Sequence, residues 1–280
     1  MSLVVGVAGA SGYVGGRVTA GLEAAGHRVV ELGRRPSAMG GHEVRHFSLD
    51  EVPSPTLLDG LDVLVHAAWD LQAVGRHPWS TNVAGSRRLL DVPAPCRVVF
   101  VSSMSAYHGT TQAYGLTKLA VERAVATRGG TSVRLGLVYG PSAAGMVGAL
   151  RRFATLPLAP LIAPDARHFM LHEDDLGPAL ARLLTAGGRI HGVVGFAHPR
   201  PVAFRDVVES LCTRPTRWVR LPWRPVYASL RGAELVHLRM PFRSDSLIGL
   251  VRPATVLPGE PVHAELGLAF RPFHEAGVGA

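Results

Sequence analysis

Three side chains suited to proton transfer follow one another within sixteen positions: Ser103, Tyr114 and Lys118. A free tyrosine has a pKa of about 10, so it is a poor base at neutral pH. Lowering that pKa by roughly three units requires about 4 kcal/mol of stabilisation of the phenolate. Because residues four apart share one face of a helix, the Lys118 ammonium can supply part of it. We therefore predict that Tyr114 exchanges a proton with a substrate oxygen held by Ser103.

Lys118 is the single lysine in 280 residues, although the chain carries 29 lysine and arginine residues together. Arginine is a broad, permanently charged fork, whereas lysine is a compact ammonium on a flexible stem. A chain that uses arginine everywhere else and lysine here indicates that this position needs the ammonium itself.

A glycine-rich loop, Gly-Ala-Ser-Gly-Tyr-Val-Gly over residues 9–15, directly follows the apolar run Leu3–Ala8. Glycines at this spacing, between a strand and a helix, allow a tight turn and let a pyrophosphate approach the helical N–H groups. The loop therefore predicts a dinucleotide site. Its predicted cofactor-binding residues are Gly9, Ser11, Gly12, Tyr13, Val14 and Gly15.

Short β-branched runs alternate with segments of helical length through the first half of the chain. The predicted strands are Leu3–Ala8, Arg28–Leu32, Val44–Phe47, Val63–His66, Arg97–Val101 and Thr131–Leu135. The predicted helices are Gly12–Ala25, Asn82–Asp91 and Gln112–Thr127. Nearly continuous apolar strands are typical of a parallel sheet covered on both faces. We therefore expect an α/β protein with a Rossmann-type, doubly wound parallel sheet.

The character of the chain changes after Pro141, where prolines become frequent and the elements become short and mixed. We expect residues 1–141, with later returning segments, to form the NAD(P)-binding domain. Residues 142–280 are expected to form mainly a small substrate-binding lobe over the carboxyl edge of the sheet, where such folds bind ligands.

The glycine spacing together with Tyr114-x-x-x-Lys118 resembles the short-chain dehydrogenase/reductase superfamily, and the Gly-Tyr-Val-Gly form resembles its extended, epimerase/dehydratase branch. Further segments resemble that branch in order and spacing over nearly the whole chain. They are Leu49-Asp50, His66–Ala68, Thr81–Gly85 with Leu89-Leu90, Val133-Arg134, Val138–Pro141, His172–Leu176 and Glu265–Pro272.

The resemblance implies an NAD(P)-dependent oxidoreductase or sugar epimerase. It gives Ser103 the role of catalytic serine, with Ser105 a weaker candidate, and lets Lys118 also bind the cofactor ribose. It adds Leu49 and Asp50 at the adenine, and Ala67, Ala68, Asn82 and Ser102 beside the cofactor. A homodimer through helices 82–91 and 112–127 is likewise an expectation from the resemblance.

The end of the second predicted strand bears on the choice between NAD and NADP. NAD-binding members carry an acidic group there for the ribose hydroxyls, whereas this chain has Gly33 followed by Arg34 and Arg35. Guanidinium forks suit a 2′-phosphate, so we expect NADP and take Arg34 and Arg35 as cofactor-binding. Glu31 lies on the same strand face as Gly33 and keeps NAD open as the alternative.

Two departures from the family pattern bear on which reaction and which substrate we expect. No Asp or Glu lies between Ser103 and Tyr114, which disfavours dehydration because elimination of water uses acidic groups in that region of the dehydratases. Leu137 stands where nucleotide-sugar enzymes usually carry an asparagine, which favours a small or apolar ketone or alcohol. Net reduction, nucleotide-sugar 4-epimerisation and a non-catalytic, dinucleotide-sensing role remain open.

Composition excludes several other classes. The formal charge of +8 is spread over single arginines and pairs, without the basic runs and interleaved aromatics of a nucleic-acid binder. Two cysteines give no disulfide framework, and no histidine pair has the partners of a metal site. No apolar stretch reaches the roughly 18 residues of a membrane span, and no basic leader precedes Leu3. We therefore expect a cytoplasmic protein that acts on a small molecule.

Overall fold

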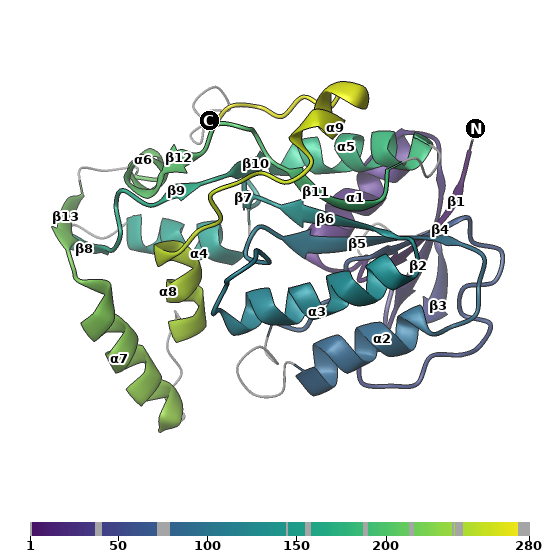
Figure 1. The fold of residues 1–280 in the computed structure, drawn as a ribbon, viewed down its shortest axis with the longest axis horizontal. Helices are drawn as coiled ribbons and strands as arrows, with labels where there is room; N and C mark the ends of the chain where they lie inside the picture. Colours follow the sequence, from purple (N-terminus) through teal and green to yellow (C-terminus); the bar gives the residue numbers. More distant parts are fainter. Residues whose placement is uncertain are drawn as a thin grey trace.

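The computed structural model describes residues 2–36, 41–71, 79–143, 145–154, 158–186, 190–212, 216–236, 238 and 243–273, without the side chains of 152–154 and 158. Figure 1 shows a central sheet with helices on both faces, and a group of smaller elements beyond one end of the strands.

The sheet has seven strands in the order β11-β6-β5-β4-β1-β2-β3, and all neighbouring strands run parallel. Their bounds are β1 (Val4–Ala8), β2 (Arg28–Gly33), β3 (Glu43–His46), β4 (Val63–His66), β5 (Arg97–Ser103), β6 (Thr131–Leu135) and β11 (Gly192–Phe196). The Rossmann-type fold and all six predicted strands are confirmed. The seventh, β11, was not predicted: two glycines in its five residues weaken the apolar signal.

Helices cover both faces of the sheet (Figure 1). The bounds are α1 (Tyr13–Ala24) and α5 (Glu173–Thr185) on one face, and α2 (Ala84–Leu90) and α3 (Ala113–Thr127) on the other. A π-helix, η2 (Trp79–Val83), leads into α2. Strand side chains alternate between two cores: Val5 and Val65 pack with α1 and α5, whereas Leu64 and Phe100 pack with α2 and α3. This is the burial on both faces that the apolar strands indicated.

Helices α1 and α5 cross at a pair of glycines. A Cβ added to Gly21 would lie 2.2 Å from the Gly177 Cα, so the two backbones touch where both side chains are missing. Glu173 and Asp174 open α5, at the end of a helix where carboxylates are favoured by the helix dipole.

The smaller elements form a third core beyond the carboxyl ends of the strands (Figure 1). Three two-stranded sheets contribute β7 (Leu137–Tyr139) with β10 (Met170–His172), β8 (Leu158–Leu161) with β13 (Arg217–Arg220), and β9 (Arg167–His168) with β12 (Val202–Ala203). The helices there are α4 (Gly145–Ala154), α6 (Phe204–Ser210), α7 (Trp223–Leu235) and α8 (Ser244–Val251), whereas α9 (Glu260–Glu265) packs on the sheet core beside β11. The domain boundary near residue 141 stays a prediction, and α5 and β11 place later residues within the sheet layers.

Candidate active site

A cavity of about 660 Å³ lies between the carboxyl end of the sheet and the smaller elements. The glycine loop forms one wall, and the ends of β5 and β6 with the start of α3 form the floor. Residues of α4, β9 and α8 close the other side. The three predicted reactive side chains, Ser103, Tyr114 and Lys118, all line this cavity.

Ser103 and Tyr114 come from different elements and meet in the cavity. β5 runs two residues beyond its predicted end and finishes at Ser103, while Tyr114 is the second residue of α3. Burial raises the pKa of the Tyr114 phenol to about 12 and Asp245 adds to the increase, whereas the Ser103 side chain acts to lower it.

Lys118 lies one turn further along α3 and is buried, with 3% of its surface exposed. Its Nζ donates to the Val101 carbonyl at 2.8 Å and lies 3.8 Å from the centre of a Trp69 ring. Burial lowers the pKa of this ammonium to about 7. The expected lowering of the Tyr114 pKa by Lys118 is therefore not found: Nζ is 5.8 Å from the centre of the Tyr114 ring, and the phenol stays protonated.

The glycine loop fits a pyrophosphate. Gly9 has a φ of +87°, and a Cβ there would lie 2.7 Å from the Ala68 backbone. A Cβ on Gly15 would lie 2.0 Å from the Gly9 carbonyl oxygen, so no larger residue fits either position. Gly12 is the N-cap of α1 and offers no side-chain acceptor, which leaves the first N–H groups of the helix to a ligand. Gly9, Gly12, Tyr13, Val14 and Gly15 line the cavity, whereas Ser11 does not.

Tyr13 ties the loop to α5. Its hydroxyl donates to the buried Glu173 carboxylate, which also accepts from the Ser142 backbone N–H at 2.8 Å and lies 3.1 Å from the Arg17 guanidinium. Burial and this hydrogen bond raise the pKa of Tyr13. The phenol is a support for the loop and not a second proton donor.

Two of the other predicted cofactor residues line the cavity, and two support its walls. Ala67 lines it, while Ala68 packs directly against Gly9. Asn82 is buried and forms two hydrogen bonds with the Asp70 backbone, at 2.8 and 2.9 Å, which fix the stretch after β4. Ser102 lines the cavity, but its hydroxyl donates to Glu122 at 2.5 Å.

The remaining predicted cofactor residues lie outside the cavity. Leu49 is buried and its carbonyl accepts from Arg88, while Asp50 is exposed. Arg34 and Arg35 are exposed beyond the end of β2. Glu31 is buried and bonded to His42 at 2.7 Å, and His42 also binds Glu23, near the end of α1. These carboxylates raise the pKa of His42, which favours the charged form of that imidazole.

Sequence reasoning missed the part of the cavity wall that α8 supplies. Arg243, Asp245 and Arg252 line the cavity, and Asp245 lies more than 130 residues after the reactive tyrosine. Trp69, Leu71, Met104 and Met146 also line it, and the Phe153 side chain lies outside the described residues. Arg200 and Arg205 do not line it, and Arg239 is not among the described residues.

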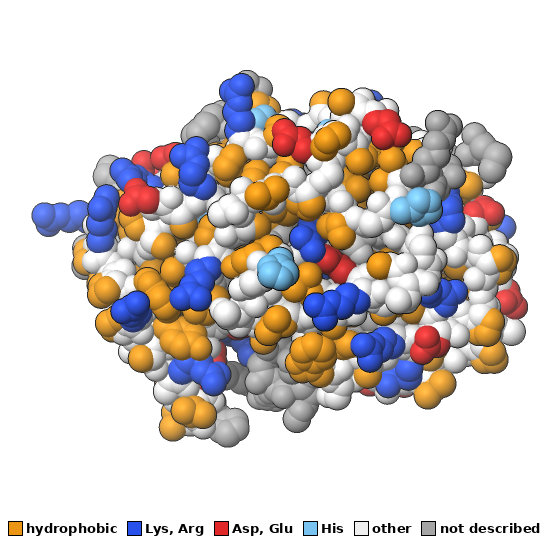
Figure 2. Space-filling model, viewed as in Figure 1, with side chains coloured by type: hydrophobic (Ala, Val, Ile, Leu, Met, Phe, Trp, Pro, Cys, Tyr) orange, Lys and Arg blue, Asp and Glu red, His pale blue; other side chains and the backbone are white. Residues whose placement is uncertain are grey.

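The described part of the chain contains no group of three or more His, Cys, Asp or Glu side chains that could hold a metal ion. None of its helices is both long enough and apolar enough to cross a membrane. On the face shown in Figure 2, basic side chains are scattered among apolar and polar ones and form no single continuous patch.

The parallel sheet, the glycine loop and the cavity that joins them define a dinucleotide-binding α/β protein. Residues 5–189 match the NAD dependent epimerase/dehydratase family, and the chain belongs to that family. The family is described as NAD dependent epimerases and dehydratases, and the proteins similar to this chain include a reductase and, among solved structures, epimerases.

Individual relatives are moderately similar to this chain in sequence. The 2'-dehydrokanamycin reductase of Streptomyces kanamyceticus is 33% identical over 262 residues, covering 82% of this chain and 72% of the relative. An uncharacterised protein of Mycobacterium tuberculosis is 28% identical over 241 residues, or 83% of this chain, which spans only 26% of that relative. UDP-glucose 4-epimerase of Thermus thermophilus, solved with NAD, superimposes with a TM-score of 0.71 at 18% identity, covering 99% and 96% of the two chains. At that identity it shows a shared fold.

Proposed function

We propose that this protein is an NAD(P)-dependent oxidoreductase that reduces a ketone, or oxidises the corresponding secondary alcohol, through Ser103, Tyr114 and Lys118. The observation that carries the proposal is that these three side chains line the same cavity as the glycine loop. A cofactor bound along the loop supplies or accepts the hydride at its nicotinamide.

The protein's own residues handle the substrate oxygen. Tyr114 donates a proton to it as the carbonyl is reduced, while Ser103 donates a hydrogen bond to the same atom and fixes its place. Lys118 lines the same cavity and would bind the cofactor ribose. The pKa of Tyr114 is raised to about 12, so the phenol carries at neutral pH the proton that a reduction requires. The similarity to a reductase supports the same direction.

The cavity wall supports an apolar or moderately polar ketone. Leu137, Met146 and Phe169 line it, and Leu137 offers no hydrogen bond to a diphosphate. A specific observation favours nucleotide-sugar 4-epimerisation as the second candidate: the Arg243 and Arg252 side chains also line the cavity and could bind phosphates. In that reaction the hydride returns to the opposite face of the same ketone.

We also propose NADP(H) as the preferred cofactor. The exposed Arg34 and Arg35 follow Gly33 at the end of β2, and the Glu31 carboxylate is occupied by His42. The Arg34→Ala and Arg35→Ala variants should each lose about 10-fold or more in NADPH affinity, because a charge-assisted hydrogen bond contributes about 1.5–3 kcal/mol. NADH affinity, measured by the same fluorescence titration, should change little. Equal losses for both cofactors would contradict the preference.

The test of the function is turnover on a panel of ketones and UDP-sugars with NADPH and NADH. Tyr114→Phe should lose about 100-fold or more in rate, as expected when a general acid is removed. Tyr227→Phe, which removes a hydroxyl on α7 outside the cavity, is the matched control and should keep its rate. Cofactor binding with no conversion that depends on Tyr114 would refute the enzyme proposal and favour a dinucleotide sensor. The cytoplasmic location and the homodimer stay predictions.

A further inference from the structure

The helix that carries Tyr114 receives no cap from its own sequence. Gln112 is the N-cap residue of α3, and it makes no side-chain hydrogen bond to the first turn. The Asp245 carboxylate, which projects from the start of α8, takes that place. It accepts the Ala113 N–H at 2.7 Å and the Tyr114 N–H at 3.2 Å. In Figure 1, α8 lies beside the beginning of α3.

We propose that Asp245 is a positioning residue for Tyr114: its carboxylate fixes the first turn of α3, and so holds the phenol beside Ser103, while it places a negative charge next to that phenol. The inference rests on the proposed function, since it assigns Asp245 a role in the same proton transfer. Asp245 acts through Tyr114 and is not itself a proton donor to the substrate.

The hydrogen bonds of Asp245 support its role in holding the first turn of α3. The first N–H groups of a helix have no partner within the helix, and a carboxylate there satisfies them and opposes the positive end of the helix dipole. Tyr114 contributes one of the two bonded N–H groups, so its backbone is held directly by Asp245. If the bond were lost, the first turn could fray and the phenol would lose its fixed distance from Ser103.

The charge of Asp245 supports its second role, which is to act on the pKa of the Tyr114 phenol. The groups near the Tyr114 side chain are Ser103 from β5, Lys118 one turn further along α3, Trp69 from the stretch after β4, and Asp245 from α8. Asp245 raises the pKa of the phenol, in the same direction as burial, while Ser103 lowers it. Asp245 therefore helps to set the pKa of the phenol, together with burial and Ser103.

Several groups around Asp245 act on its carboxyl. Burial raises its pKa and Glu234 of α7 adds to that increase, while the two backbone N–H groups and Arg243 oppose it, and the net direction is upward. Glu234 is itself bound by the Ser244 backbone and hydroxyl, at 2.9 and 2.8 Å. The residues that follow Asp245 on α8, Ser246, Gly249 and Leu250, line the cavity. The cap therefore also joins the substrate wall to the reactive tyrosine.

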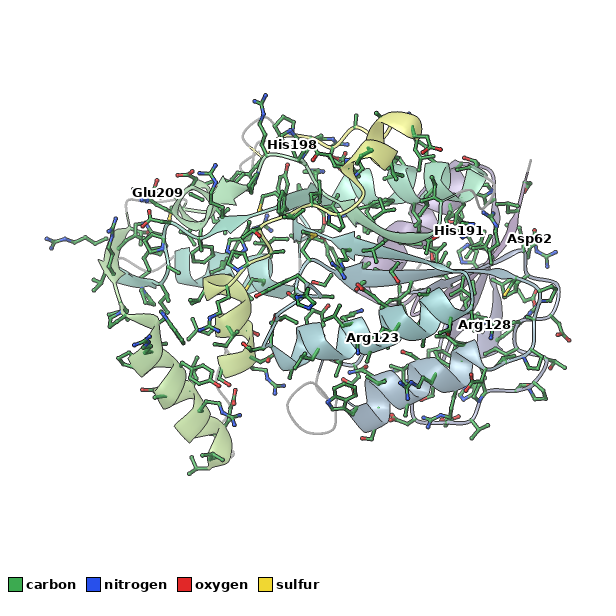
Figure 3. All side chains as sticks on the ribbon, in the orientation of Figure 1. Asp62, Arg123, Arg128, His191, His198 and Glu209 are labelled. Carbon is green, nitrogen blue, oxygen red and sulfur yellow. The ribbon has the colours of Figure 1, made fainter. Side chains whose placement is uncertain are left out.

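The experiment compares Asp245→Asn, Asp245→Ala and Asp62→Asn with wild type. Asp62 is the matched control, because its carboxylate likewise accepts a distant backbone N–H, that of Val4, at 2.7 Å. It lies at the opposite end of the sheet, as labelled in Figure 3. Hydrogen exchange of the peptide around 112–116 measures the cap without any substrate. Asp245→Ala should exchange there about 5-fold faster or more, because these N–H groups lose their acceptor, and Asp62→Asn should not.

Measurements of turnover distinguish a positioning role of Asp245 from a role in the stability of the fold alone. Asp245→Asn keeps one acceptor and loses the charge, so the pH at which the rate reports Tyr114 ionisation should fall, on the order of one pH unit. Its kcat should fall more than its KM rises. Asp62→Asn should lower Tm by a few degrees with an unchanged pH profile.

The two proposals can fail separately. An Asp245→Asn pH profile that coincides with that of Asp62→Asn would overturn the electrostatic role of Asp245. Unchanged exchange in Asp245→Ala would overturn the cap. If no conversion depends on Tyr114 in wild type, the proposed function fails, while the exchange measurement still decides whether Asp245 holds the helix.

Discussion

Lys118 should reduce the stability of the fold that contains it. Burial lowers the pKa of its ammonium from 10.5 to about 7. At 1.36 kcal/mol for each pH unit, that difference makes folding less favourable by about 5 kcal/mol at low pH. Replacing the side chain by the unbranched Met keeps the packing of its stem and removes the charge. It also leaves the Val101 carbonyl without its Nζ donor, which costs about 1–3 kcal/mol. We therefore expect Lys118→Met to be more stable than wild type by about 2–4 kcal/mol at pH 6.5, and inactive.

The stability difference between Lys118→Met and wild type should change with pH in a definite direction. Between about pH 7 and 10.5 the unfolded chain keeps the Lys118 proton and the folded chain has lost it. The unfolded state then binds more protons, so the Lys118 contribution makes stability rise with pH across that window. The penalty is complete below about pH 7 and gone above 10.5. The advantage of Lys118→Met should accordingly shrink between pH 6.5 and 9.5.

Urea unfolding of wild type, Lys118→Met and Arg123→Met at these two pH values tests the reasoning. Arg123 lies on the same helix with an exposed side chain, labelled in Figure 3, and its replacement should change stability by less than about 0.5 kcal/mol at either pH. A Lys118→Met variant that is less stable than wild type at pH 6.5, or an advantage that does not vary with pH, would refute the assignment of a buried, costly ammonium.

Two further predictions concern the glycine loop and a buried ion pair. Gly15→Ala brings a Cβ within 2.0 Å of the Gly9 carbonyl and should abolish cofactor binding in a fluorescence titration, whereas Gly232→Ala, in open space on α7, should bind normally and gain up to about 1 kcal/mol. Glu122→Gln weakens the paired contacts with Arg134, at 2.7 and 2.9 Å, and should lower the free energy of unfolding by about 3 kcal/mol. A loss below about 1 kcal/mol would show that the pair is replaceable.

The elements predicted well are those whose signal is local. Each of the six predicted strands is an apolar run bounded by turn residues, and the glycine loop carries its own spacing. β11 was missed because Gly192 and Gly195 interrupt its short apolar run. The end of β5 was placed two residues early, since Ser102 and Ser103 were taken for a loop although they still pair with β6.

The parts of the site formed by residues close together in the sequence could be predicted. The part contributed by a distant segment, α8, could not. Ser103 and Tyr114 could be paired through the resemblance to the family pattern, and both line one cavity. The absence of acids between them was read correctly from the sequence, yet Asp245 brings a carboxylate to the first turn of α3 from α8. Its only local signal is its position at the start of a helix, where an acidic residue usually serves its own helix. The protonation of Tyr114 also depends on burial, which no spacing reveals.

The distance in sequence between Asp245 and α3 sets an order of events during synthesis. Translation delivers β1 to β6, with α3, well before the segment that holds Asp245, and domains tend to fold as they emerge. A nascent chain that ends before residue 243 therefore contains Tyr114 on a helix whose first two N–H groups lack their acceptor. Competence for proton transfer would then be acquired late, after most of the sheet is already in place.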